Sequence, residues 1–339
     1  MSRVVLYRFR PYLMPLLVLG VTWVVMAWIS STFRGEGSVY AVLENLPLLG
    51  LIALAIAVTM IAGELDLSVG SMAAMAGVLA VKAADHGLVP CVAWAVAVCV
   101  VVGAIQGFLI AKTAINSLVF TIGTLILLRG VTYMLSGGPN GQAPVTLEDF
   151  GVSDALLARH WVFSVSSITA LVVFALVGVF LAFARAGREI YAIGGARAEA
   201  AAAGVSTTWS LTIVFAISAG CAALAGSLAS LRGGSAAPEN YADLLLTGVA
   251  AAALGGVSLW GGRGTVINVL IGVFILGVVT AALAARGAEG STVQLITGAL
   301  LLGVIGLEFV ESRLAGRNRG RPRHPDRAPP GPAPAPEVT

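Results

Sequence analysis

The sequence predicts an all-α polytopic membrane protein with about ten transmembrane helices. Of its 339 residues, 58% are hydrophobic and only 11% are charged, whereas roughly a quarter of the residues in a soluble domain carry a charge. The mean hydropathy is +0.94. These values exclude a soluble globular protein. The net charge of +3 is also too small to indicate nucleic acid as a partner.

Long windows without charged residues mark the expected spans, because a charged side chain at mid-bilayer costs at least about 2.5 kcal/mol. Each span needs roughly 20 apolar residues. Ten windows contain no charged residue or a single one, over residues 11–33, 45–62, 67–84, 89–111, 115–135, 161–184, 207–231, 244–260, 265–285 and 291–308. The first is too long for the core of a signal peptide. We therefore expect a transmembrane domain over residues 11–308.

The Lys and Arg residues predict the orientation of these spans. With ten spans, both termini lie on one side of the membrane, and most of the basic residues of the chain fall on that side. Cytoplasmic loops carry the excess of Lys and Arg, so residues 1–10 and 309–339 are expected in the cytoplasm. The segment 309–339 is rich in Arg and Pro and is predicted to be disordered. Its basic beginning offers a contact for anionic membrane lipid.

Small residues at helical spacing predict close packing between the spans. Helices in lipid associate by backbone approach, which needs glycine or alanine on one face. Gly103 with Gly107, and Ala73 with Gly77, have the spacing of such a face. The chain contains 41 glycines, so we expect a dense helical bundle.

The sequence lacks the motifs of an energy-transducing or hydrolytic enzyme. It contains no phosphate-binding Gly-rich loop with Lys, no His-Glu-x-x-His helix and no Gly-x-Ser-x-Gly turn. The three cysteines are scattered without Cys-x-x-Cys spacing, so no metal site is expected. We predict neither a cofactor nor an enzymatic activity in this chain. If the chain moves a solute uphill, the energy has to come from a partner or from an ion gradient.

Acidic residues near the second and third windows have two interpretations. Glu64 and Asp66 lie between two apolar windows, and Ser68 follows them. In the first interpretation they form a cytoplasmic turn, and Asp66 or Ser68 caps the next helix, where the helix dipole favours negative charge. In the second, a helix is broken at membrane depth and lines a pathway.

Three further polar residues lie inside or beside the spans. Arg129 lies within an apolar window, where it either extends to the membrane interface or pairs with a carboxylate in the bundle. Gln106 and Asn116 can join helices through hydrogen bonds, or they can contact a solute.

The charged segment 185–206 is a candidate docking element. Gly194 and Gly195 are expected to break any helix that continues from the preceding span. Residues 196–203 favour a short helix that stops at Gly204. Such a helix on the cytoplasmic face offers a surface to a soluble partner, and an ordinary solvated loop is the alternative.

Four stretches together resemble one family, the membrane permease subunits of ribose-, xylose- or arabinose-type ABC sugar importers. Residues 63–71 read GELDLSVGS and are similar to the family's G-x-I-D-L-S-V-G-S signature. The other three stretches occur in the same order as in the family. They are 120–138, with FTIGT, RG and SGG; 187–204, with GREIYAIGG and a later AAAAG; and 255–264, GGVSLWGGRG.

This resemblance implies a permease with a type II ABC-importer-like bundle in the inner membrane. It implies a dimer with a second permease copy, a partner ATPase that binds ATP and Mg, and a periplasmic or lipid-anchored sugar-binding protein. It also assigns roles to residues of this chain. Coupling to the ATPase falls to Arg188, Gly194, Gly195, Arg197, Glu199 and Gly204. The substrate pathway or structural signature comprises Asp66, Ser68, Asn116, Thr121, Arg129 and Arg263.

Two departures from the family pattern affect these roles. Glu199 stands one place nearer Gly204 than in the family, and Arg197 precedes it. Residues 115–117 replace a turn that usually contains proline. The competing hypothesis is a stand-alone secondary transporter or small-solute channel that uses Asp66 or Glu64, although no inverted repeat with paired broken helices is visible.

Overall fold

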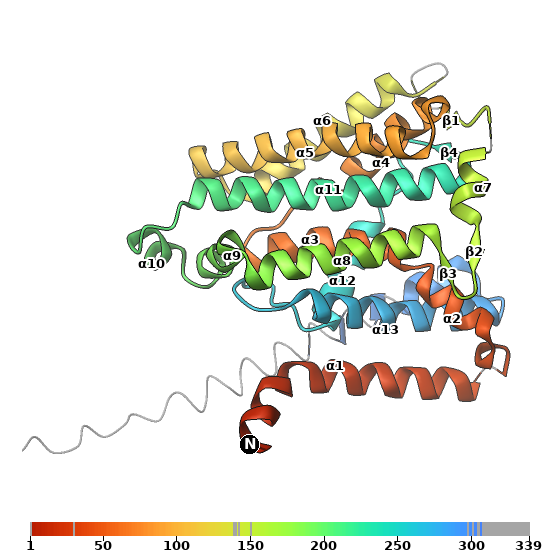
Figure 1. Ribbon diagram of the computed structural model, residues 1–339, viewed down its shortest axis with the longest axis horizontal. Helices are drawn as coiled ribbons and strands as arrows, with labels where there is room; N and C mark the ends of the chain where they lie inside the picture. The colour runs from red at the N-terminus through yellow and green to blue at the C-terminus, as the bar shows by residue number, and fades with distance from the viewer. Residues whose placement is uncertain are drawn as a thin grey trace, which may run out of the picture.

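Most long helices of the chain run along one direction, so their ends gather at two opposite ends of a bundle (Figure 1). In this computed structural model, helices α9 (Arg185–Gly195) and α10 (Arg197–Ala202) mark one end, called the α10 end below. Helix α7 (Gly151–Leu157) marks the other, the α7 end. The structure describes residues 2–296 except 30, 138–140, 142 and 150, and then only 298, 299, 302, 303 and 306. The predicted tail lies outside the described residues.

Seven helical stretches in the described part of the chain are long and apolar enough to cross a membrane, and each matches one of the predicted windows. They are α1 (Ser2–Ile29), the stretch formed by α2 (Glu36–Leu43), η2 (Leu46–Gly50) and α3 (Leu51–Ile61), α5 (Leu88–Thr113), α6 (Ser117–Leu135), α8 (Val165–Phe183), α11 (Thr207–Gly233) and α13 (Val266–Ala285). The prediction of an all-α polytopic membrane protein is confirmed.

Two predicted windows form helices that are too short to cross a bilayer alone. Helix α4 (Val69–Lys82) has 14 residues and α12 (Leu244–Leu254) has 11. At 1.5 Å per residue they rise about 21 and 17 Å, against about 30 Å of hydrocarbon. The last window, 291–308, is helical at each of its described residues, which are 291–296, 298, 299, 302, 303 and 306. The number of ten spans therefore stays a prediction.

The remaining elements are short and lie mainly at the α7 end. They are η1 (Ser31–Arg34), η3 (Ala84–His86), β1 (Val145–Thr146), β2 (Arg159–His160), β3 (Phe163–Ser164) and β4 (Ser235–Ala236). Strand β1 pairs antiparallel with β4, with Val145 opposite Ala236, and β2 pairs antiparallel with β3. Ladders of two residues tie loops together, and they contribute little else to the fold.

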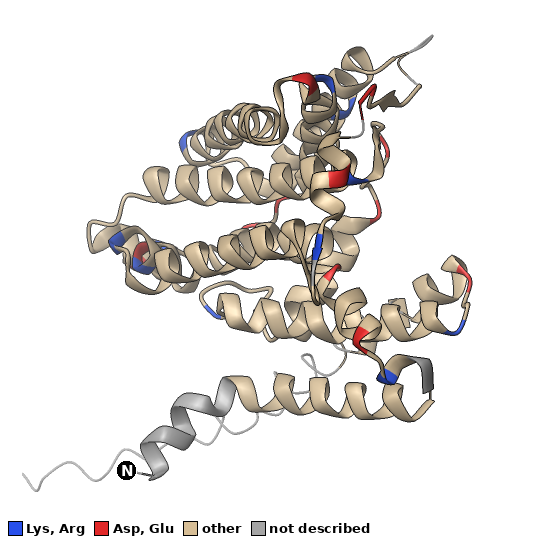
Figure 2. Cartoon of the chain, turned by 45° about the vertical axis from the view of Figure 1, so that its right-hand side comes forward, with Lys and Arg blue, Asp and Glu red and all other residues tan. Residues whose placement is uncertain are grey.

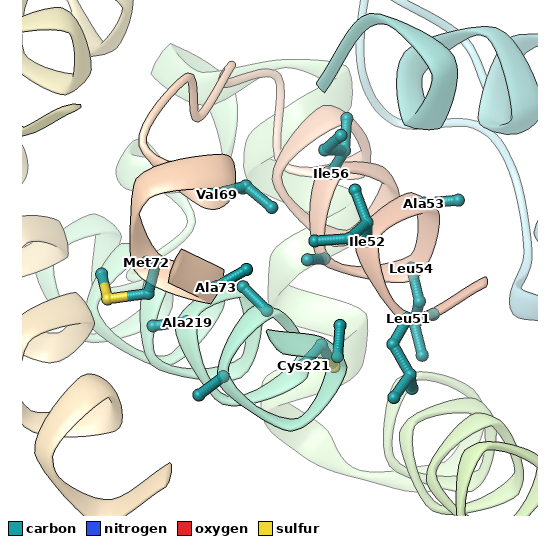
Figure 3. Close-up of a cluster of buried hydrophobic side chains, with 14 of the residues drawn as sticks. Leu51, Ile52, Ala53, Leu54, Ile56, Val69, Met72, Ala73, Ala219 and Cys221 are labelled. Carbon is teal, nitrogen blue, oxygen red and sulfur yellow. The ribbon is translucent and has the colours of Figure 1, made fainter. Parts of the chain in front are cut away.

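The core of the bundle is formed by α3, α4 and α11. Figure 3 shows Leu51 and Ile52 of α3, Ala73 of α4 and Cys221 of α11 in one buried cluster. All residues of α3 are buried, whereas α1 has a largely exposed surface and packs mainly against α13. Helix α11 also contacts α5 along much of its length, which makes it the central helix of the bundle.

The predicted small-residue faces are confirmed as sites of close backbone approach. A Cβ atom added to Gly103 or Gly107 of α5 would lie 2.4 or 2.5 Å from a carbonyl oxygen of α11. A Cβ atom added to Gly226 of α11 would lie 1.9 Å from the carbonyl oxygen of Ala73 in α4. No side chain larger than hydrogen fits at these positions without moving a helix.

We expect Gly226→Ala to lower the free energy of unfolding by about 1 to 3 kcal/mol, because the methyl group must separate α4 from α11. The matched control is Gly123→Ala in α6, where nothing lies within 4 Å of the added Cβ atom. Thermal unfolding of the two purified variants measures the difference. Equal melting temperatures for both would contradict the close contact.

Candidate functional site

The segment between α8 and α11 forms a small helical unit at the α10 end. The prediction that Gly194 and Gly195 break the helix of the preceding span is wrong in position. The break lies at Ala184, whose ψ of 149° ends α8, and α9 runs on through Gly195. A Cβ atom at Gly187 would lie 2.5 Å from the Phe180 carbonyl oxygen, so the chain turns back tightly on α8. Arg188 donates to the Phe183 carbonyl oxygen at 3.0 Å and caps α8.

The helix expected over residues 196–203 is observed as α10, a separate helix beyond Ala196. Gly204 has a φ of +86° and ends it, as predicted. Ala200 is buried, whereas Arg197 and Glu199 lie on the exposed side of the helix. Helix α10 packs chiefly on α9 and presents a charged surface at the end of the bundle (Figure 2).

Five glycines from three distant segments meet beside α9 in what we call the glycine junction: Gly63, Gly194, Gly195, Gly261 and Gly262. The Gly262 amide donates to the Ile61 carbonyl oxygen at 2.9 Å. A Cβ atom at Gly194 would lie 1.9 Å from that same oxygen, and one at Gly261 would lie 2.5 Å from the Gly194 oxygen. The junction therefore joins the ends of α3 and α9 to the 255–264 loop by backbone contact.

A tyrosine fixes the same loop from α9. The Tyr191 hydroxyl donates to the Gly264 carbonyl oxygen at 2.8 Å. Burial raises the pKa of Tyr191, which keeps the hydroxyl protonated as a donor. Within the loop, the Ser258 amide donates to the Arg263 carbonyl oxygen at 3.1 Å, while the Arg263 side chain is exposed. Arg263 thus shapes the loop through its backbone.

A cavity of about 430 Å³ lies under α10, between the ends of α5, α6 and α11. Glu64 and Arg197 form an ion pair on its wall, with the Glu64 side chain 9% exposed and that of Arg197 44% exposed. Asn116 and Ser117 line it from the start of α6. Asn116 accepts the Leu118 amide at 2.8 Å and so caps α6.

Asp66 lies inside the bundle. The residue is only 3% exposed. It accepts hydrogen bonds from the Ser68 amide at 2.9 Å, the Gln106 side chain at 3.3 Å and the Ser218 hydroxyl at 3.1 Å, as well as from the Ser68 hydroxyl. Ser218 is eleven residues along α11, or about 17 Å from the start of the helix at Thr207. Residues 62–68 thus form a non-helical segment that runs from the end of α3 into the bundle, beside the middle of α11.

The broken segment 62–68 is stabilised by hydroxyl groups of α6. The Leu65 amide donates to the Ser117 hydroxyl at 3.4 Å, and the Leu67 amide donates to Thr121 at 3.2 Å. Non-helical backbone at membrane depth needs such partners inside the protein. The Ser68 side chain makes no capping bond to α4; Asp66 lies before the α4 terminus instead, where the helix dipole favours its charge.

The other predicted polar residue, Arg129, lies far from this cluster, towards the α7 end. It pairs with Glu239, which also accepts a hydrogen bond from Tyr133 at 2.6 Å. These bonds hold the pKa of Glu239 below its usual range. Arg129 therefore pairs with a carboxylate, which is one of the two interpretations of this residue. The pair is partly exposed, however, and is not buried in the bundle.

The structure thus brings together Asp66, Ser68, Asn116 and Thr121 around the broken segment, and it adds the Glu64–Arg197 pair beside them. Ser218 was missed, because a single serine in an apolar helix gives no signal in the sequence. Among the described residues, no group of three or more His, Cys, Asp or Glu is placed to hold a metal ion.

Comparison with known protein families shows to which family the chain belongs. A family profile described as "Branched-chain amino acid transport system / permease component" matches residues 38–305. The chain belongs to this permease family. The match begins in α2 and includes the broken segment, α9, α10 and the glycine junction.

Three curated relatives show how much of the sequence of this chain can be aligned with known permeases. The ribose import permease protein of Escherichia coli is 29% identical over 283 residues, which is 81% of this chain and 86% of the relative. The L-arabinose ABC transporter permease protein of Azospirillum brasilense is 32% identical over 258 residues, 74% of each chain. The D-allose transport system permease protein of Escherichia coli is 31% identical over 227 residues, 65% of this chain and 67% of the relative. No solved structure matches the chain.

Proposed function

We propose that this permease is the membrane subunit of an ABC importer for a monosaccharide or a related small polar solute. The observation that carries the proposal is the family match over 38–305, together with relatives named for ribose, arabinose and allose. In this proposal a partner ATPase binds ATP and Mg and supplies the energy. A periplasmic or lipid-anchored binding protein delivers the solute, and a second permease copy completes the pathway.

The proposed orientation places the α10 end in the cytoplasm of a cell with an inner membrane. α1 and the α2–α3 stretch cross in opposite directions, and α3 ends at the glycine junction, so the N-terminus belongs to the α10 side. The basic residues of 1–10 then join Lys112, Arg185, Arg188, Arg197 and Arg263 on that side. This agrees with the excess of Lys and Arg in cytoplasmic loops.

The ATPase is proposed to dock on α9 and α10. The exposed polar groups there, Arg188, Arg197 and Glu199, offer a charged contact surface at the end of the bundle. The glycine junction packs α9 directly against the end of α3 and the 255–264 loop. A displacement of α9 by the ATPase would therefore move these membrane segments with it. Alternating access requires rigid elements that pack in two arrangements, and the unit of α9 and α10 is proposed as one of those elements.

The test is solute uptake into proteoliposomes that contain this chain, the ATPase and the binding protein. We expect uptake of labelled ribose, arabinose or allose that requires ATP and the binding protein and that a protonophore leaves unchanged. Branched-chain amino acids serve as the competing solute class in the same assay. Uptake by this chain alone, abolished by a protonophore and indifferent to ATP, would overturn the proposal and favour a secondary transporter that uses Asp66 or Glu64.

A further inference from the structure

The ion pair between Glu64 and Arg197 connects two parts of the chain that are 133 residues apart. Arg197 is the first residue of α10, at the surface of the bundle. Glu64 belongs to the broken segment and lies two residues before the buried Asp66. The pair is therefore a side-chain link between the proposed docking helix and the interior of the membrane domain.

The surroundings of the pair leave α10 room to move relative to the bundle. Arg197 of α10 lines the cavity together with residues at the ends of α5 and α6. Helix α10 otherwise packs chiefly on α9. Glu64 is nearly buried, so its carboxylate depends on Arg197 for a compensating charge, and a displaced Arg197 leaves that charge unpaired.

The broken segment carries such a displacement inward. Glu64 is followed by Leu65, whose amide donates a hydrogen bond to the Ser117 hydroxyl of α6. Asp66 then binds Gln106 of α5 and Ser218 of α11. Coupling in proteins passes through contiguous hydrogen-bonded and packed groups of this kind, provided that they have two arrangements.

We propose that Glu64 and Arg197 are positioning residues that couple movement of α10 to the Asp66 cluster and so to helices α5, α6 and α11. The inference rests on the proposed function, in which an ATPase docks on α10. Neither residue is required to touch the solute. Their effect is on how much solute moves for each ATP hydrolysed.

The experiment uses the full complex with ATPase and binding protein in proteoliposomes, and it measures ATP hydrolysed per solute imported. Arg197→Gln removes the link, and Arg197→Glu adds a second negative charge beside Glu64. We expect the ratio to rise by about 2- to 10-fold in Arg197→Gln and further in Arg197→Glu. The double exchange Glu64→Arg with Arg197→Glu is expected to restore part of the coupling.

The matched control is Arg232→Gln, which removes an ion pair between a partly exposed arginine and a nearly buried carboxylate at the α7 end, Arg232 with Glu44. Its ratio is expected to stay at the wild-type value. Because Arg197 is partly exposed, its variants are expected to assemble, and the ratio is taken per assembled complex. A wild-type ratio in both Arg197 variants would overturn the coupling role while leaving ATP-driven import intact. Failure of the wild-type complex to import at all would instead refute the proposed function.

Discussion

Gly194→Ala is expected to stop ATP-driven import almost completely. The added methyl carbon would lie 1.9 Å from the Ile61 carbonyl oxygen and 2.8 Å from the Gly262 nitrogen, which are the two atoms of the hydrogen bond at the centre of the glycine junction. Both neighbours are backbone, so neither can rotate away. We expect a loss of about 3 kcal/mol in stability and at least about a tenfold loss in import rate.

Gly195→Ala is the matched control for this prediction. It adds the same methyl group one residue further along α9, where nothing lies within 4 Å. We expect import and melting temperature close to those of the wild-type complex. The measurement is initial uptake in proteoliposomes, together with thermal unfolding of the purified chain. Similar import in Gly194→Ala and Gly195→Ala would contradict the close packing at the junction.

Asp66→Leu is expected to have the second largest effect. Leucine removes the acceptor for the Ser68 amide, the Gln106 amide and the Ser218 hydroxyl, all inside the bundle. An unsatisfied buried donor costs about 1 to 3 kcal/mol, so we expect the chain to lose about 3 to 5 kcal/mol of stability. Loss of folded permease, measured by size-exclusion chromatography after mild heating, reports this change.

Asp66→Asn separates the hydrogen bonds from the charge at the same position. Its oxygen can still accept from Ser68, and the Ser218 hydroxyl can rotate to accept from the new amide. We expect folding and ATP-dependent import within about threefold of wild type, since the ATPase supplies the energy. If Asp66→Asn folded but lost all import, the negative charge itself would be required, as in an ion-coupled transporter.

The membrane class and most of the helices could be predicted from the sequence because the cost of charge in lipid is large and local. Seven windows with at most one charged residue became long helices for this reason. The short helices α4 and α12 were not distinguished from full spans, because an apolar window does not show where the backbone leaves the helix. The turns after α12 contain Gly256, Gly261 and Gly262 at positive φ, and only their tertiary contacts determine where the helix ends.

The candidate site was predicted in part. The residues of the broken segment were identified, and so was the helix α10, because Gly204 and an alanine-rich run are strong local signals. The depth of Asp66 was not predictable, since it depends on Gln106 and Ser218, which lie far away in the sequence. The pairing of Glu64 with Arg197 was missed for the same reason.

The position of Asp66 also affects how the chain is made. Its partner Ser218 lies 152 residues later, so at about 5 to 20 residues per second the ribosome delivers that hydroxyl roughly 8 to 30 s after the carboxylate. During that interval Asp66 has no complete set of donors, and a bare carboxylate in lipid is costly. Asp66 therefore gains its full set of hydrogen-bond donors only after α11 has been synthesised.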